Sequence, residues 1–215
     1  LGYRVGLFTS PHIDTIYERI QVNGVEISED DYKKFQDRVG HGVEEVAKIK
    51  FDDMTWFDAF FLIAMSYYGD QEVDFVVLEA GIGGRIDSTN GVGSVDHLGN
   101  TLEEITRVKL GAMRKNSTAI LAPNQRKIVE KMFIDYASER NTRMVFAEDL
   151  KVEKTSNRIK CNLQGKDMEF SCSFAADYQV ENMQTALTFL EDFSMKKHIQ
   201  VTEDLLEKSL GHLQI

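Results

Sequence analysis

The order of apolar and polar residues at the start of the chain predicts a strand followed by two helices. Residues 5–10 form a short apolar run that ends before Pro11, because the residue that precedes a proline is driven out of helical geometry. From Ser28 onward, apolar residues recur at helical spacing behind a capping box. A second box at Thr55 opens a helix that is apolar around its whole circumference, which predicts a buried helix.

The pattern continues as strands that alternate with helices. Residues 74–80 are almost entirely apolar, which predicts a strand covered on both faces, as in parallel sheets. Thr101 and Glu104 form a capping box for a helix over 101–112, followed by a strand at 117–122, a helix at 125–140 and a strand at 143–147. This alternation predicts an α/β fold with a doubly wound, mostly parallel sheet flanked by helices.

The last third of the chain has a different pattern. Apolar and polar residues alternate over 151–174, around turn signals at Ser156 and at Gln164-Gly165, which predicts a small antiparallel β flap. Helices at 180–193 and 202–210 follow.

Composition and charge narrow the class of protein. The chain has 215 residues, of which 42% are hydrophobic and 28% charged, and this excludes a disordered or fibrous chain. The formal charge of −10 disfavours nucleic acid and anionic membranes as partners. The longest apolar stretch, 56–68, is too short to span a bilayer. Cys161 and Cys172 could lie opposite each other on a hairpin, but two thiols make no disulfide framework, which indicates the cytoplasm.

Polar residues after the strands are the first candidates for chemistry, because ligands of open α/β sheets bind at the carboxyl ends of strands. Glu79 interrupts an apolar strand, and a buried carboxylate needs a cation or strong donors. On residue type alone, Arg85 and a metal ion are equally good partners for it. The glycine-rich loop at 81–90 would let backbone N–H groups approach a ligand, although such loops are common after strands.

Other candidates have ordinary structural explanations beside the functional ones. His97 after Asp96 is either a metal ligand or a solvated loop histidine. The ordinary structural role for Lys109 is that of a helix lysine whose side chain extends along apolar neighbours to reach solvent. Ser10, Pro11 and His12 could form a simple turn. The sequence has no Gly-x-x-x-x-Gly-Lys-Ser/Thr segment, so these residues alone provide no nucleotide-phosphate loop.

Taken together, the segments point to one family. GYRVGLFTSPHI, ERIQVNG, MTWFDAF, VLEAGIGGRIDSTN and DYQVENMQTAL occur in the order found in folylpolyglutamate synthase and bifunctional dihydrofolate synthase of the Mur ligase superfamily. The chain resembles this family over nearly its whole length. The resemblance implies an ATPase domain of an ATP-dependent ligase, in which a folate or dihydropteroate carboxylate becomes an acyl phosphate that the amine of L-glutamate attacks. It also implies Mg²⁺ as cofactor and ATP as co-substrate.

The resemblance also implies roles for individual residues. Ser10, Glu79 and His97 correspond to Mg²⁺ ligands, and His97 and Lys109 to catalytic residues. Lys109 matches a lysine that the family carbamylates, and a carbamate is a long carboxylate able to support a magnesium site. Asn182 matches a residue near ATP. The matches to substrate-binding segments are Thr55, Trp56, Phe57, Asp58, Ile86, Asp87 and Ser88.

The chain departs from the family pattern in three places. The phosphate loop would precede Leu1, the glutamate-ligase domain would follow Ile215, and an apolar strand is missing between Asn90 and Asp96. We therefore expect residues 1–215 to be the central ATPase domain of a longer, monomeric, cytoplasmic enzyme, with a chain break within 90–98. On its own this fragment should be inactive.

Two alternatives remain at this stage. The first is a non-catalytic folate-binding or regulatory remnant that has lost its phosphate loop, and the second is a Mur-type ligase that adds an amino acid to a cell-wall precursor. A phosphate-loop segment encoded upstream of Leu1 would argue against the remnant. Competition between folate and a cell-wall nucleotide would separate the two ligases.

Overall fold

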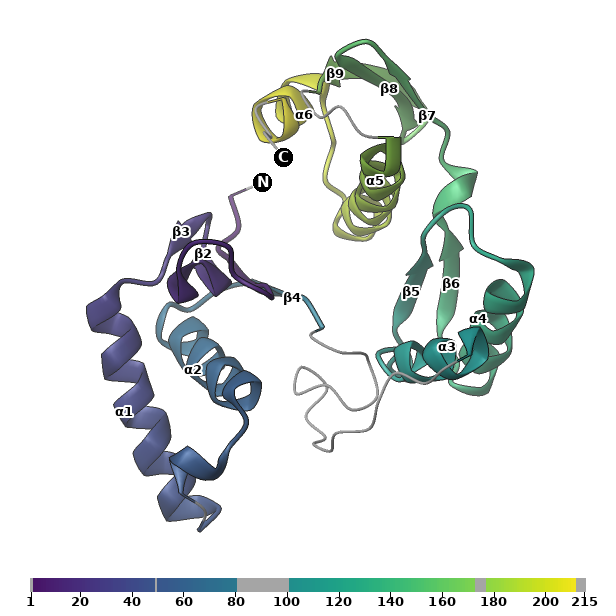
Figure 1. The fold of residues 1–215 in the computed structure, drawn as a ribbon. Helices are drawn as coiled ribbons and strands as arrows, with labels where there is room; N and C mark the ends of the chain where they lie inside the picture. The colour runs from purple at the N-terminus through teal and green to yellow at the C-terminus, as the bar shows by residue number, and fades with distance from the viewer. Residues whose placement is uncertain (1, 49, 81–100, 173–176, 212–215) are drawn as a thin grey trace. The chain divides into compact units, whose positions relative to one another are not determined.

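The computed structural model describes residues 2–48, 50–80, 101–172 and 177–211 (Figure 1). The chain divides into two compact units, residues 1–112 and 113–215. The chain break expected within 90–98 lies outside the described residues. Within the described ranges, no helix is long and apolar enough to cross a membrane.

The first unit contains a mixed four-stranded sheet in the order β3-β2-β1-β4. β1 pairs parallel with β4, with Val5 opposite Phe75, and antiparallel with β2. The β2–β3 hairpin was not predicted from the sequence; its turn residues Asn23 and Gly24 both have positive φ, as a type I′ turn requires. The strands are β1 (Val5–Phe8), β2 (Ile20–Val22), β3 (Val25–Glu26) and β4 (Phe75–Leu78).

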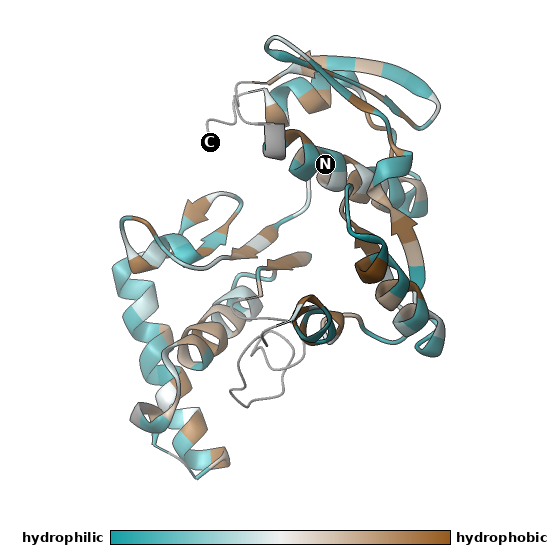
Figure 2. Cartoon of the chain, turned by 45° about the vertical axis from the view of Figure 1, so that its right-hand side comes forward, coloured by the Kyte–Doolittle hydropathy of each residue, from teal (hydrophilic) through white to brown (hydrophobic). Residues whose placement is uncertain are grey.

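Two helices pack beside this sheet and begin where their caps predict. Ser28 accepts a hydrogen bond from the Asp31 N–H at the start of α1 (Glu29–Val46), and Thr55 accepts one from the Asp58 N–H at the start of α2 (Trp56–Asp70). In Figure 2, α1 is largely hydrophilic and α2 largely apolar. The inner residues of α2 are fully buried with others in one core: Phe8, Ile20, Phe35, Phe60, Ile63 and Ala64. Short 3-10 helices, η1 (Ile16–Arg19) and η2 (Phe51–Asp53), precede β2 and α2.

The prediction that both faces of the strand at 74–80 are covered is wrong for the described residues. Val76, Val77 and Leu78 are 39%, 51% and 37% exposed. The reason is position, because β4 is the edge strand of this sheet and pairs only with β1 among the described strands. The apolar composition of β4 predicted a strand, but it did not show that the strand lies at the edge of the sheet.

The helix predicted at 101–112 is present as α3 (Leu102–Leu110), with both bonds of its capping box. The Glu104 N–H donates to the Thr101 hydroxyl over 3.2 Å, and the Thr101 N–H donates to the Glu104 carboxylate over 3.1 Å.

The second unit contains a parallel pair of strands and the predicted antiparallel flap. β5 (Thr118–Leu121) and β6 (Arg143–Phe146) are joined through α4 (Lys127–Glu139), and η4 (Ala147–Asp149) leads on to the flap. The flap consists of β7 (Val152–Thr155), β8 (Arg158–Leu163) and β9 (Lys166–Ser171), in that order. Residues of β8 and β9 share a core with α5 (Asp177–Lys197) and α6 (Glu203–Leu210).

The two cysteines lie on the predicted flap but not opposite each other. Cys161 pairs with Met168 across β8 and β9, whereas the Cys172 N–H bonds to the Asn157 carbonyl. Both thiols are free and buried. Burial, followed by the charge of Glu191, raises the pKa of Cys161 to about 11, so its thiol stays protonated.

Gln164, at the turn between β8 and β9, connects the flap to α5 and the segment after it. Its side-chain amide donates to the Ser194 hydroxyl over 3.0 Å and to the Ile199 carbonyl over 2.8 Å. The amide oxygen accepts the Val201 N–H, and the backbone N–H of Gln164 donates to Glu191. Sequence analysis identified Gln164 only as a turn residue.

Gly6→Ala tests the close approach of β1 to α2. A Cβ at Gly6 would lie 2.8 Å from Cδ1 of Tyr68, whose ring is fully buried, so the ring or the strand must shift. We expect a loss of about 1–3 kcal/mol in the free energy of unfolding, measured by urea denaturation. Gly42→Ala is the matched control, because among the described residues no atom other than neighbouring residues and the helix's own backbone lies within 4 Å of its added Cβ, and alanine favours helix α1. Equal midpoints for the two variants would contradict the clash.

Asp192→Asn tests the ion pairs that connect α5 to β6. Asp192 accepts hydrogen bonds from Arg143 and Lys196. Desolvation alone would raise the pKa of Asp192, but these two cations outweigh it and lower the pKa. The stabilisation is therefore present above the unfolded-state pKa and is lost as pH falls through the folded-state value. We expect the variant to lose about 0.5–1 kcal/mol at pH 7 and to match the wild type in acid, below both pKa values.

The control for this experiment is Asp204→Asn. Among the described residues Asp204 pairs only with Lys208, and both side chains are more than 70% exposed. Urea midpoints of both variants across the acid range separate the two positions. A pH-independent loss for Asp192→Asn would show that its role is not electrostatic.

Candidate functional site

The carboxyl ends of β1 and β4 bring two of the predicted site residues together. The Glu79 N–H donates to the Phe8 carbonyl over 2.9 Å, which extends the parallel pairing by one residue beyond β4. The Ser10 N–H donates to Oε2 of Glu79 over 2.8 Å. The Glu79 carboxylate, which was expected to be buried, is exposed. Among the described residues its hydrogen-bond donor is the backbone N–H of Ser10. Arg85, the other predicted partner, lies outside the described residues.

The loop that carries Ser10 is held by its own acidic residue. The Thr9 N–H donates to the Arg19 carbonyl over 3.1 Å and closes the base of the loop. A single carboxylate oxygen of Glu18 accepts three backbone N–H groups, at 2.6, 2.7 and 2.9 Å, from Ile13, Asp14 and Thr15. Desolvation acts to raise the pKa of Glu18, but these three donors outweigh it and the pKa is lowered.

A second connection joins the same loop to the core. Nε of Arg19 lies 2.9 Å from Nδ1 of His12, and the guanidinium carbon of Arg19 lies 5.4 Å from the centre of the Phe60 ring. Phe60 is fully buried, so Arg19 has a rigid surface beneath it. Sequence analysis gave neither Glu18 nor Arg19 a role. The capping-box spacing of Thr15 and Glu18 was the available signal for Glu18.

An aromatic cavity lies near the start of α2. Its volume is about 200 Å³, and its lining residues are Tyr32, Gln36, Phe51, Met54, Trp56, Ala59 and Phe60. Trp56 is 75% exposed and stacks on Phe60, with ring centres 5.5 Å apart. A planar aromatic ligand could stack on this indole.

Of the described residues predicted to bind substrate, only Trp56 lines this cavity. Thr55 and Asp58 form the helix cap, and Phe57 packs edge-on against the core residue Phe8. Ile86, Asp87 and Ser88 lie outside the described residues.

The oxygen atoms at the end of β1 and β4 are suited to a hard cation. Mg²⁺ prefers hydroxyl and carboxylate oxygens, usually from one or two side chains together with phosphate oxygens. Ser10 offers a hydroxyl and Glu79 a carboxylate, of which the described contacts use Oε2. Among the described residues, no group of three His, Cys, Asp or Glu side chains could hold a metal. His97, the third predicted ligand, lies outside the described residues.

Two other predicted residues are exposed on helices. Lys109 lies in the last turn of α3. Asn182 lies on α5 in the second unit. No described contact connects Lys109 to Ser10 or Glu79.

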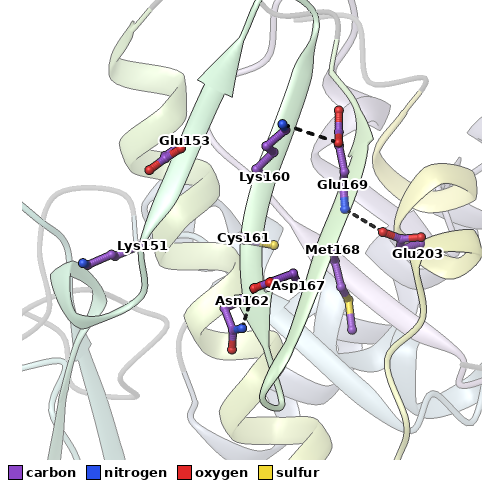
Figure 3. Close-up of a pocket in the computed structure, with 9 residues that line it drawn as sticks. All are labelled: Lys151, Glu153, Lys160, Cys161, Asn162, Asp167, Met168, Glu169 and Glu203. Carbon is purple, nitrogen blue, oxygen red and sulfur yellow. Dashed lines mark hydrogen bonds and ion pairs between the residues drawn. The ribbon is translucent and has the colours of Figure 1, made fainter.

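A larger hollow lies over the flap in the second unit (Figure 3). Its volume is about 520 Å³. Its charged groups bind one another, because Lys160 lies 3.7 Å from Glu169 and Glu203 accepts the Glu169 N–H. Asn162 likewise donates to Asp167 over 2.7 Å. These contacts pair Lys160, Asn162, Asp167, Glu169 and Glu203 without a ligand, so the hollow is a weaker candidate than the edge at Ser10 and Glu79.

Comparison with known proteins agrees with the resemblance that the sequence motifs indicate. No protein-family model matches the chain. A dihydrofolate synthase/folylpolyglutamate synthase of Bacillus subtilis is 37% identical over 137 residues, which are 58% of this chain and 32% of that protein. A folylpolyglutamate synthase of Saccharomyces cerevisiae is 25% identical over 94% of this chain and 40% of its own length. The chain is similar to folylpolyglutamate synthases.

Solved structures agree with this similarity. The folylpolyglutamate synthase of Thermotoga maritima matches with a TM-score of 0.83 and 26% identity, over the whole of this chain and 52% of that structure. A complex of folylpolyglutamate synthase with AMPPCP and folate matches with a TM-score of 0.82 and 21% identity, over 99% of this chain and 57% of that one. The resemblance and the Mur-ligase-type α/β fold are therefore confirmed. The chain spans about a third of the length of the first curated relatives it matches.

Proposed function

We propose that the complete protein ligates L-glutamate to folate at the expense of ATP, with dihydropteroate as a further acceptor. Its curated relatives are dihydrofolate and folylpolyglutamate synthases. A solved folylpolyglutamate synthase of the same fold binds AMPPCP and folate. In this proposal residues 1–215 are the central ATPase domain of a monomeric, cytoplasmic enzyme. A phosphate loop and a glutamate-ligase domain would come from other parts of the protein.

The meeting of Ser10 and Glu79 at one sheet edge is the observation that carries this proposal. The γ-phosphoryl group of ATP passes to the folate carboxylate, the glutamate amine attacks the acyl carbon, and phosphate leaves from the tetrahedral intermediate. Ser10 and Glu79, with His97, would hold Mg²⁺, which would supply positive charge to offset the negative charge of phosphoryl transfer. The Ser10 N–H fixes one oxygen of Glu79, so the carboxylate is oriented before the metal binds.

The remaining predicted residues have supporting roles in the proposal. Trp56 would stack on the pteridine ring, and the segment from Ile86 to Ser88 would complete that site. Asn182 would lie near ATP. Lys109, once carbamylated, would support the magnesium site as an additional carboxylate. Formation of this carbamate requires an uncharged lysine amine, and Lys109 is exposed.

The decisive measurement is ADP formation by the complete protein, with folate and glutamate supplied separately and together. We expect ADP only when both are present. No ADP formation together with folate binding would favour the non-catalytic remnant. ADP formation that depends on a cell-wall nucleotide would favour the other Mur-type ligase.

Glu79→Gln tests the metal site. The amide keeps the size of the side chain but removes the negative charge that a magnesium ion requires, so we expect glutamate-dependent ADP formation to fall by at least about a hundredfold. Glu44→Gln, an exposed position on α1, is the matched control and should leave turnover unchanged. Near-normal turnover in Glu79→Gln across magnesium concentrations would remove Glu79 from the site.

Trp56→Leu tests the aromatic cavity. Loss of ring stacking should weaken folate binding about tenfold, whereas Trp56→Phe should retain most of the affinity. Both variants should keep the wild-type unfolding midpoint, because this side chain is 75% exposed. Calorimetric titration with folate gives the affinities. Equal folate affinity in Trp56→Leu and wild type would place the pteridine elsewhere.

A further inference from the structure

The contact between Arg19 and His12 determines which nitrogen of the histidine carries a proton. An arginine side chain has only donors and is always protonated. The Arg19 Nε–H therefore donates to Nδ1 of His12, over 2.9 Å, and Nδ1 must be the unprotonated acceptor. In the neutral imidazole the proton then resides on Nε2. His12 is exposed, and within the described residues its Nε2–H has no partner.

Three further contacts fix the place of this donor. Arg19 itself is held, because its guanidinium lies over the buried Phe60 ring and its carbonyl accepts the Thr9 N–H. Glu18 holds the backbone just after His12 through three N–H groups. His12 is two residues from Ser10, so the two Cα atoms are at most about 7.6 Å apart. The imidazole is thus held by Arg19 on a loop that also carries Ser10, the residue that meets Glu79.

From this arrangement, we propose that His12 donates its Nε2–H to an anionic oxygen of the substrate bound at the Ser10–Glu79 edge, and that Arg19 is the positioning residue that sets its tautomer. The proposal rests on the proposed function for the identity of the anion. Two sources share this chemistry, the terminal phosphate of ATP and the carboxylate of folate. Both are oxyanions that a neutral imidazole N–H can bind without adding charge.

The first test is spectroscopic and needs no substrate. The complete protein is labelled with ¹⁵N-histidine, and the resonances of His12 are identified by their loss in His12→Gln. We expect the Nε2–H tautomer in the wild type and a mixture of tautomers in Arg19→Gln. An Nδ1–H tautomer in the wild type, or the same tautomer in both proteins, would overturn the role of Arg19 whether or not the protein is a ligase.

The second test measures binding and turnover. His12→Leu should lower kcat/KM about ten- to a hundredfold, as expected for loss of a hydrogen bond to a charged group. His12→Gln, which keeps an N–H donor at a similar reach, should recover most of this loss. A raised KM for ATP alone identifies the phosphate as the acceptor, and a raised KM for folate alone identifies the carboxylate. Unchanged kinetics in His12→Leu would exclude the donor role.

A double-mutant cycle separates positioning from simple support of the loop. If Arg19 acts through His12, then adding Arg19→Gln to His12→Leu should cost little more than His12→Leu alone. Fully additive losses would mean that Arg19 acts independently of His12. Calorimetric binding of magnesium-AMPPCP and of folate to the same variants keeps the test valid if the wild type has no ligase activity. Wild-type affinity for both ligands in His12→Leu would then overturn the proposal.

Discussion

The packing of Tyr68 against β1 is the contact on which the first unit depends. The Tyr68 ring lies against Gly6, where no side chain could fit unchanged, and its hydroxyl donates to the Leu7 carbonyl over 2.5 Å. Burial raises the pKa of Tyr68, so the hydroxyl remains a donor at any physiological pH. β1 is thereby fixed on α2 while it pairs with β2 on one side and β4 on the other. The position of Ser10 after β1 follows from this placement.

Local signals in the sequence predicted the elements well. Ser28, Thr55 and Thr101 each cap the helix that their spacing indicated, because a cap and its N–H partner lie three residues apart and need no distant contact. The antiparallel flap likewise followed from its alternating pattern. The hairpin at Asn23-Gly24 was missed because its two strands have only three and two residues, too few to show a period.

Contacts between distant residues were harder to predict. A topological rule made Ser10 and Glu79 candidates because each follows a strand, and the structure joins them by a hydrogen bond although 69 residues separate them. The exposure of β4 was not foreseeable, because apolar composition shows that a strand can be covered and not whether it is central. Glu18 and Arg19 have ordinary surface-residue character in the sequence. Their roles appear only when the loop returns and places them beside His12 and the N–H groups at 13–15.

The Gln164 side chain links the flap to α5 and to the segment that follows α5, so these parts should move together. Its amide provides two donors and one acceptor to α5 and to the segment after it, while its own N–H is bound to Glu191. The flap cannot separate from both α5 and the segment after it unless all four hydrogen bonds break. These elements should therefore open as one cooperative unit rather than by fraying strand by strand. Asn182, on the same helix, should then keep its position relative to the flap when the unit opens.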